Sequence, residues 1–504
     1  QTGMPTPIPS LNADGKDTRG IISKLGTQKG INTADAKINI ETGDENVGML
    51  ASGGNAQVIN QGTISITDND TTDTEKGNFG MATALKRSFK REAGTDGVLW
   101  TSDDKISYNT PTGSTDYYQI GYAENSGKIS INTKSKKNVG ILINSADNAT
   151  VDGISGINKK GTGKTTKTSE INIETAGNIG IANFGDFTME AGTINVKGAG
   201  SVGIYSNYGH SNGAGSGASS TIIKEAADNT KAAINAKEGA VALYVENSST
   251  GTAKTEVKIQ NTDLTIGKGG LLFYNYSTTP TPNVYKATGT LNITDTGVNA
   301  TIQNNGLAFL LKQNTTSSPY WDANDILNNI TSASGKKLTL KMENGARLFL
   351  IDAGSNATVT TSDVTNIKNA LNASGSTITI DPTSGNFKYV TLKGGTFNVS
   401  DDVSLGDANN TFALIDYIAS NVNIFSGKTI SNVNVATNEG ERFATGDQYV
   451  IAQINPKLIS DGGTAGDITV KNDGSIIIKE NSANGATVAC YCNITIICNS
   501  YVSV

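Results

Sequence analysis

The sequence predicts an all-β protein folded as a right-handed parallel β-helix (a β-solenoid) with loop insertions. Short runs of alternating apolar and polar residues recur along the chain, each followed by a turn and a second apolar run. Glycine (57 of 504 residues) and asparagine (55) are abundant, whereas proline (9) is scarce. Gly and Asn tolerate the positive φ of tight corners, and Pro would remove a donor from a strand ladder. These observations together indicate stacked strands joined by tight turns.

Four copies of the repeat are clear, and weaker copies follow them. The four are Lys37–Gly43 with Asn46–Gly53, Lys128–Thr133 with Asn138–Asn144, Glu170–Gly177 with Asn178–Asn183, and Thr193–Gly198 with Ser201–Ser206. Strand side chains alternate between two faces, so Ile173 and Ile194 are expected in the core and Asn172 and Asn195 outside. A period of roughly 20–25 residues without a helical pattern predicts about 20 rungs, fewer where the inserts are long.

Composition excludes several classes of function. The chain has a net charge of −6 and a pI near 5.1, so it lacks the broad basic surface of a protein that binds nucleic acid. Its single histidine, His210, cannot build a multi-histidine metal site. The adjacent carboxylates of Asp103 and Asp104 would face opposite sides of a strand, unlike a glycosidase pair. We therefore expect that the chain is not an enzyme.

Four segments interrupt the repeat, at about 82–122, 205–229, 274–286 and 314–334, and binding residues commonly lie on such loops. Aromatic residues are concentrated in them, and aromatic rings stack on sugars or fill receptor pockets. The candidate ligand-binding residues are Tyr108, Tyr117, Tyr118, Tyr122, Tyr320 and Trp321. The alternative is that these aromatics form small satellite cores under long loops. A short helix is expected at Ala84–Arg91.

One acidic loop is a candidate cation site. Asp96, Asp103 and Asp104 surround a glycine-containing turn and would supply oxygen ligands to Ca²⁺, the only cofactor that the sequence suggests. The alternative is a solvated acidic turn, because the spacing of an EF-hand is absent.

The pattern Ile-Asn-Ile-x-Thr/Gly followed by Asn-x-Gly-Ile/Met resembles the passenger region of type V autotransporters, above all the large Asn/Lys-rich adhesins of fusobacteria. The resemblance covers roughly residues 30–480. It implies a virulence-associated adhesin at the bacterial cell surface, in the outer membrane or secreted, that binds host-cell receptor proteins or glycans and other bacteria. It also implies a signal peptide and an outer-membrane barrel anchor outside this segment. The alternatives are a β-helical polysaccharide lyase or glycoside hydrolase, and a passive stalk spacer.

Three parts are expected along the chain. Residues 1–30 form a lead-in or cap, residues 31–480 form the β-helix with its inserts, and residues 481–504 form an atypical tail. The tail contains all three cysteines, Cys490, Cys492 and Cys498, and no function is inferred from it.

Overall fold

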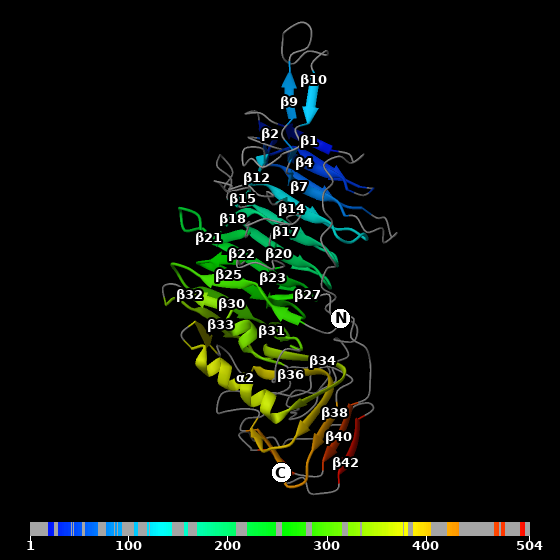
Figure 1. The fold of residues 1–504 in the computed structure, drawn as a ribbon, viewed down its shortest axis with the longest axis vertical. Coiled ribbons are helices and arrows are strands. Elements are labelled where there is room, and N and C mark those ends of the chain that lie inside the picture. Colours follow the sequence, from blue (N-terminus) through cyan, green and yellow to red (C-terminus); the bar gives the residue numbers. More distant parts are fainter. Residues whose placement is uncertain are drawn as a thin grey trace.

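The computed structural model describes residues 19–24, 29–41, 43, 45–52, 56–68, 77–84, 86–87, 89–92, 105–108, 118–119, 121–143, 156–159, 169–207, 219–247, 255–278, 285–314, 321–332, 335–375, 377–381, 387–404, 421–432, 468–472, 475–478 and 494–498. Strands dominate these residues and stack in rungs along the long axis of an elongated molecule (Figure 1). Among the described residues, no helix has the length and hydropathy needed to cross a membrane.

Three parallel sheets form the β-helix. Sheet A contains β1 (Arg19–Lys24), β4 (Val47–Ser52), β7 (Phe79–Ala84), β14 (Val139–Ile143), β17 (Ile179–Asn183), β20 (Val202–Asn207), β23 (Val241–Glu246), β26 (Leu271–Tyr274), β31 (Leu307–Leu311), β34 (Arg347–Thr360), β36 (Lys388–Val399), β38 (Asn421–Ile424), β40 (Ile468–Asn472) and β42 (Ile494–Cys498). Sheet B contains β2 (Lys29–Asn32), β5 (Gln57–Asn60), β12 (Tyr122–Asn125), β15 (Gly156–Lys159), β18 (Asp186–Glu190), β21 (Ser220–Lys224), β24 (Glu256–Ile259), β29 (Thr290–Ile293) and β32 (Ile330–Ser332). Sheet C contains β3 (Lys37–Ile40), β6 (Thr63–Ile66), β13 (Lys128–Ile131), β16 (Glu170–Ile173), β19 (Thr193–Lys197), β22 (Ala232–Lys237), β25 (Thr262–Ile266), β30 (Val298–Ile302), β33 (Leu338–Met342) and β35 (Ile378–Asp381).

Each complete rung visits sheets A, B and C in that order, and every strand pair within the three sheets is parallel. The predicted fold class, an all-β parallel β-helix, is therefore confirmed, while the handedness of the coil stays a prediction. Sheet A has 14 strands among the described residues, fewer than the 20 rungs expected, because the connections between strands lengthen many repeats.

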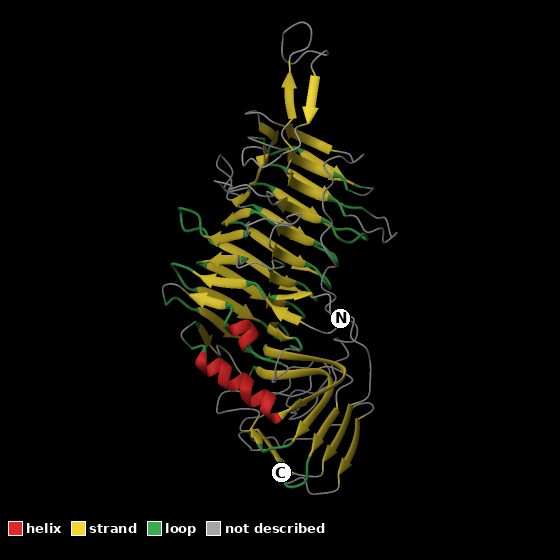
Figure 2. Ribbon diagram, in the orientation of Figure 1, coloured by secondary structure: helices red, strands yellow, loops and turns green. Residues whose placement is uncertain are grey.

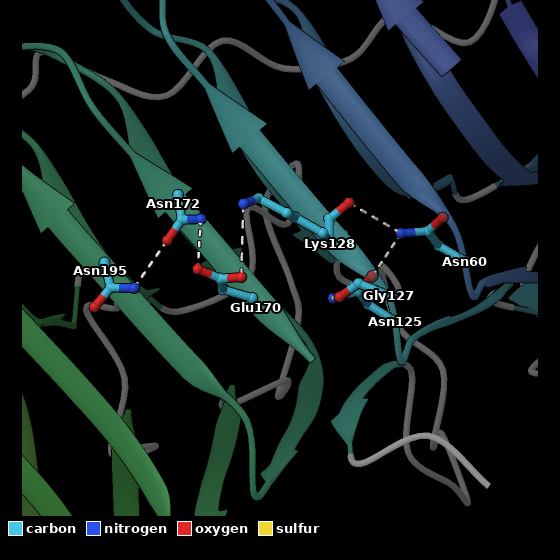
Figure 3. A network of polar contacts seen from close by, with 7 residues as sticks. All are labelled: Asn60, Asn125, Gly127, Lys128, Glu170, Asn172 and Asn195. Atoms are coloured by element: carbon cyan, nitrogen blue, oxygen red, sulfur yellow. Dashed lines mark hydrogen bonds and ion pairs between the residues drawn. The ribbon is translucent and has the colours of Figure 1, made fainter. Parts of the chain in front are cut away.

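The alternation within Ile-Asn-Ile places residues as predicted. Ile171, Ile173 and Ile194 are at most 1% exposed and belong to one continuous core shared by the three sheets. Asn195 lies on the outer face, where its amide donates to Asn172 Oδ1 at 2.8 Å, and Asn172 donates in turn to Glu170 Oε1 (Figure 3). Asn172 itself is only 7% exposed, so this outer ladder is packed as well as hydrogen-bonded.

A second ladder explains the asparagine of the Asn-x-Gly motif. Asn46, Asn78, Asn138 and Asn178 precede consecutive strands of sheet A, and all but Asn46 are fully buried. The backbone N–H of Asn78 donates to Asn138 Oδ1 at 2.9 Å, and the N–H of Asn138 donates to Asn178 Oδ1 at 3.1 Å. Each side chain thus supplies the acceptor that a turn N–H would otherwise lack, since buried backbone donors need a partner.

The glycine of the same motif is required by close backbone approach. A Cβ built on Gly48, Gly80, Gly140, Gly180 or Gly203 would lie 2.5–2.7 Å from the carbonyl oxygen of the equivalent residue in the next rung. Real Cβ atoms do not approach so closely, and Gly is the residue that permits such contact. In the next rung the position carries Ala242, so the column of glycines ends there.

A helix replaces a strand near the end of the three-sheet region. α2 (Thr361–Ala373) lies between β34 and β35, where the preceding rungs place a strand of sheet B, and it contacts the short α1 (Asn324–Leu327) (Figure 2). Val364, Ile367 and Leu371 are its buried face. Asp363 Oδ2 accepts hydrogen bonds from Thr360 N and Oγ1, which caps the first turn. This helix was not predicted from the sequence, although the spacing of its apolar residues and its cap are helical signals.

Beyond β36 the rungs have two strands. Sheet A continues through β38, β40 and β42, and a second parallel sheet forms from β37 (Val403–Ser404), β39 (Thr429–Asn432) and β41 (Ser475–Ile478). β42 lies within the predicted cysteine-containing tail, and its backbone pairs in register with β40.

The helix expected at Ala84–Arg91 is wrong. β7 extends to Ala84, and two short antiparallel pairs follow: β8 (Lys86–Arg87) with β11 (Tyr118–Gln119), and β9 (Phe89–Glu92) with β10 (Lys105–Tyr108). Ala, Leu, Lys and Arg favour a helix, but cross-strand pairing within the insert outweighs this local propensity.

Candidate functional site

The long insertions leave the β-helix at one corner. Between a strand of sheet A and the following strand of sheet B, which we call the A–B corner, six of nine connections have nine or more residues. These six are 85–121, 144–155, 208–219, 247–255, 275–289 and 312–329. At the other two corners only 67–78 and 160–169 are as long. The four inserts predicted from the sequence overlap four of the six, so one edge of the rod carries them.

Beside this corner, tyrosines of successive rungs form a column on sheet A. Tyr205, Tyr244 and Tyr274 are register partners in β20, β23 and β26, with consecutive ring centroids 4.9 Å apart in edge-to-face contact. Tyr276 and Tyr285, in the antiparallel strands β27 (Tyr276–Thr278) and β28 (Tyr285–Ala287), extend the column. The rings of Tyr205, Tyr244, Tyr274 and Tyr276 are at most 7% exposed. The aromatics of the third predicted insert therefore pack inward and belong to the main buried cluster, with Tyr285 packed against it.

A buried carboxylate anchors the column. Glu246, 7% exposed, accepts hydrogen bonds from the hydroxyls of Tyr205 at 2.8 Å and Tyr244 at 3.2 Å. Asn207 donates to the Tyr205 hydroxyl at 2.8 Å. Burial, followed by the charge of Glu246, raises the pKa of Tyr205 and of Tyr244 well above the ordinary tyrosine value. Both phenols are therefore fixed donors, which suits a structural network rather than acid–base chemistry.

Trp321, from the described part of the fourth predicted insert, is also built into the core. Trp321 is 1% exposed, and its indole N–H donates to the backbone oxygen of Asp352 at 3.3 Å. The Asp352 carboxylate forms an ion pair with Lys312, whose ammonium lies 4.9 Å from the ring centroid of Tyr285. Trp321 therefore has no exposed ring face for a ligand, because it fills the space between the insert and β34.

Two carboxylates lie at the start of α1: Asp322 precedes the helix, and Asp325 is in its first turn. Burial, and secondarily the neighbouring Asp322, raises the pKa of Asp325 to about 6, although hydrogen bonds from Asn314 oppose the shift. The Asp325 backbone oxygen accepts from the buried Asn275 side chain at 3.1 Å. No group of three or more potential metal ligands occurs among the residues that the structure describes.

Three of the predicted site residues lie in the described part of the first insert or at its end. Tyr122 opens β12, is half-buried, and donates to Glu124 Oε2 at 3.1 Å. Burial and the Glu124 charge raise the pKa of Tyr122 above the ordinary value. The backbones of Tyr108 and Tyr118 lie in β10 and β11. The structure thus places Tyr108 and Tyr118 in the insert between β7 and β12, and Tyr122 in the strand at which that insert ends.

The remaining predicted residues lie outside the described part of the chain. They are Tyr117, Tyr320 and the three Ca²⁺ candidates Asp96, Asp103 and Asp104. Their roles stay predictions.

Strand registers also bear on the enzyme alternative. Catalysis on a β-helix of the lyase or hydrolase type would place carboxylates from successive rungs beside each other. In the registers of the described strands every carboxylate pairs with a residue of another kind, as Glu170 does with Lys128 and Thr193. The expectation that the chain is not an enzyme stays a prediction.

Comparisons with known proteins leave the family open. No protein-family model and no curated protein matches the chain. A solved structure that aligns with it is the crystal structure of a TibC-catalysed, hyper-glycosylated TibA 55–350 fragment. The alignment covers 96% of this chain and 100% of that chain at 12% identity, with a TM-score of 0.22. A similarity this low supports no argument, so the fold assignment rests on the strand registers described above.

Proposed function

We propose that this chain is the surface-exposed, adhesin-like segment of an exported bacterial protein of the autotransporter passenger type. Its partners are host-cell receptor proteins or glycans, and other bacteria, and its site of action is the bacterial cell surface or the secreted fraction. The observation that carries the proposal is the gathering of the long insertions at the A–B corner. A rigid scaffold that presents variable loops along one edge suits recognition, because the loops change without disturbing the stacked rungs.

The first insert is the best placed of the six for contact with a partner. It is the longest A–B connection, 85–121, and its strand pairs β8–β11 and β9–β10 form outside the three main sheets. By contrast, the inserts that contain Tyr276 and Trp321 bury these rings against sheet A. We therefore assign partner contact to the first insert, with Tyr108, Tyr117 and Tyr118 inside it and Tyr122 at its end as the contact residues.

The test replaces residues 85–120 of the intact chain with a short Gly-Ser linker and keeps Gly121 and β12. Binding of the wild type and the variant is measured on a mammalian glycan array and on epithelial cell monolayers. We expect at least a tenfold loss of binding with unchanged circular dichroism, because neighbouring rungs support each other. A matched variant with residues 208–218 replaced should bind as the wild type does.

Three outcomes contradict the proposal. If the 85–120 variant binds as the wild type does, the contact lies outside the first insert. If the wild-type protein binds neither the array nor the cells, the result favours the alternative that the chain is a passive stalk spacer. Release of reducing ends or unsaturated sugars from a polysaccharide panel supports the enzyme alternative.

A further inference from the structure

A ridge of lysines follows the corner between sheets C and A, on the other side of sheet A from the inserts. Five consecutive turns form it, at 132–138, 174–178, 197–201, 237–240 and 267–270. The ridge comprises Lys134, Lys136, Lys137, Lys197, Lys237 and Lys268, which we call the basic ridge. The only acidic residues of these turns are Glu174 and Glu238. Six positive and two negative charges leave +4 on the ridge of a chain whose net charge is −6.

The backbone holds the ridge in a regular array. Every turn has at least one residue with a positive φ, among them Lys137 (66°), Gly177 (73°), Gly200 (72°), Gly239 (88°) and Gly269 (73°). These residues bond to the following turn, for example Lys137 N–H to the Gly177 oxygen at 2.7 Å and Gly200 N–H to the Gly239 oxygen at 3.2 Å. Parallel stacking repeats at roughly 4.8 Å, so the five turns span about 19 Å. The lysines therefore lie along one line of turns, with three in the first turn, none in 174–178 and one in each of the last three.

None of the six lysines is buried. Lys134, Lys136 and Lys237 are exposed, and Lys137, Lys197 and Lys268 are half-buried. Lys197 pairs with Glu174 at 2.8 Å and Lys237 with Glu238 at 3.5 Å. Lys134, Lys136 and Lys137 form no ion pair with a carboxylate of the described residues.

The basic ridge also has a packed lysine stem and a row of polar neighbours. The aliphatic stem of Lys136 crosses Gly177, since a Cβ on that glycine would lie 2.8 Å from Lys136 Cγ. The stem is thus supported while the ammonium stays in water. On the same outer face, two residues before Lys197 and Lys237, stand Asn195 and Asn235, whose amides form the outer ladder. A line of ammonium groups beside a line of amides offers both ionic and hydrogen-bonding contacts.

We propose that the basic ridge binds a linear sulfated polysaccharide of the glycosaminoglycan class along the axis of the rod. Sulfates on such a chain would meet the ammonium groups, and sugar hydroxyls would meet the amides. Single-stranded nucleic acid fits less well, because its binding sites add aromatic rings that stack on bases, and the five turns contain none. An anionic membrane fits less well too, since the only side chains of these turns that are wholly apolar are alanines.

Binding of heparin to the intact chain, measured by titration calorimetry at several salt concentrations, tests the proposal. Neutralising a linear polyanion gives a salt slope of about −0.7 per charge, so a net charge of +4 predicts roughly −3. The triple variant Lys134→Gln, Lys136→Gln and Lys137→Gln should bind at least tenfold more weakly with a slope near −1. The matched control is Lys29→Gln, Lys37→Gln and Lys336→Gln, three exposed lysines away from the ridge, which should change affinity less than twofold.

A lysine variant could lose heparin binding because it misfolds, so a variant that gains positive charge provides an independent test. Glu174→Gln with Glu238→Gln raises the ridge charge to +6 and should tighten heparin binding and steepen the slope. Equal weakening by both lysine triples would overturn the proposal, as would affinity for hyaluronan or for oligo(dT) equal to that for heparin. The variant lacking residues 85–120 should keep full heparin affinity, which separates this site from the proposed function of the inserts.

Discussion

Replacing Asn138 with alanine tests the inner asparagine ladder, the feature that explains the Asn-x-Gly motif. Asn138 is fully buried, and its Oδ1 is the acceptor for the backbone N–H of Asn78. Its amide donates to Asn178 Oδ1 at 2.9 Å and to Thr133 Oγ1 at 3.1 Å. Alanine removes all three contacts and leaves the Asn78 N–H without an acceptor in a site closed to water.

The expected loss follows from these contacts. A buried donor left unsatisfied costs about 1–3 kcal/mol, and each lost hydrogen bond of the side chain contributes about 0.5–1.5 kcal/mol net. Allowing for relaxation of the turn, we expect a loss of about 3 kcal/mol for local opening of these rungs. One decade of equilibrium constant corresponds to roughly 1.4 kcal/mol, so protection from hydrogen exchange should fall about a hundredfold.

The assay is hydrogen exchange of the intact chain, followed by mass spectrometry of peptides from β7 and β14. The matched control is Asn195→Ala on the outer ladder, where Asn195 is half-buried and water can replace its partners. We expect the control to lose less than about 1 kcal/mol, in peptides of β19 and β22. Equal losses at Asn138 and Asn195, or a loss spread evenly over the whole rod, would refute the reasoning.

Further predictions concern glycine, charge and the tyrosine column. Gly140→Ala should lower the free energy of unfolding in urea by about 1–3 kcal/mol, because its Cβ would lie 2.5 Å from the Gly180 oxygen. The control is Gly335→Ala, where φ is +68° and the space is open, and this variant should lose only about 1 kcal/mol of stability. A larger loss at Gly335 than at Gly140 would contradict the account based on close backbone approach. The pKa of Asp325 is raised to about 6, so the folded state holds this proton more tightly than the unfolded chain, and Asp325 destabilises the protein as pH rises through the window from about 4 to 6. Asp325→Asn should therefore be more stable than the wild type at about pH 7, by about 1 kcal/mol after allowance for its partial exposure, and the difference should vanish near pH 4; a constant difference would argue against titration. Because their pKa values are raised, Tyr205 and Tyr244 should ionise only as the chain unfolds in alkali. Their phenolate absorbance should therefore appear together with the loss of the β-sheet circular dichroism signal. Ionisation at a lower pH than unfolding would mean that the tyrosine column is open to solvent.

The sequence predicted the rungs well because their signal is local. Ile194, Asn195 and Val196 alternate between core and outer face as any strand with one buried side must. The motif Asn-x-Gly marked the turns, although its two roles, as a ladder acceptor and as a point of close approach, appear only when rungs are stacked. The helix expected at Ala84–Arg91 failed for the same reason, since pairing partners such as Tyr118 lie far along the chain.

Candidate site residues were harder to place. Aromatic clustering identified the inserts, but it did not distinguish a ring that contacts a ligand from one that packs inward. Trp321 illustrates this limit, because its burial depends on Asp352, 31 residues away. The basic ridge could not be assembled from the sequence, since Lys137, Lys197, Lys237 and Lys268 are separated by 30 or more residues, and the whole chain is acidic.

The sequence by itself determined which side chains of each rung face the core, and where the chain turns, because both depend on neighbours within about five residues. Only the tertiary structure decided which residues of neighbouring rungs contact each other. Tyr205 meets Tyr244, and Lys137 meets Gly177, across intervals of 39 and 40 residues that contain connections of unequal length. The physical reason is that parallel stacking makes every lateral contact a long-range one, so register, and not local pattern, places the inserts at one corner and the lysines at another.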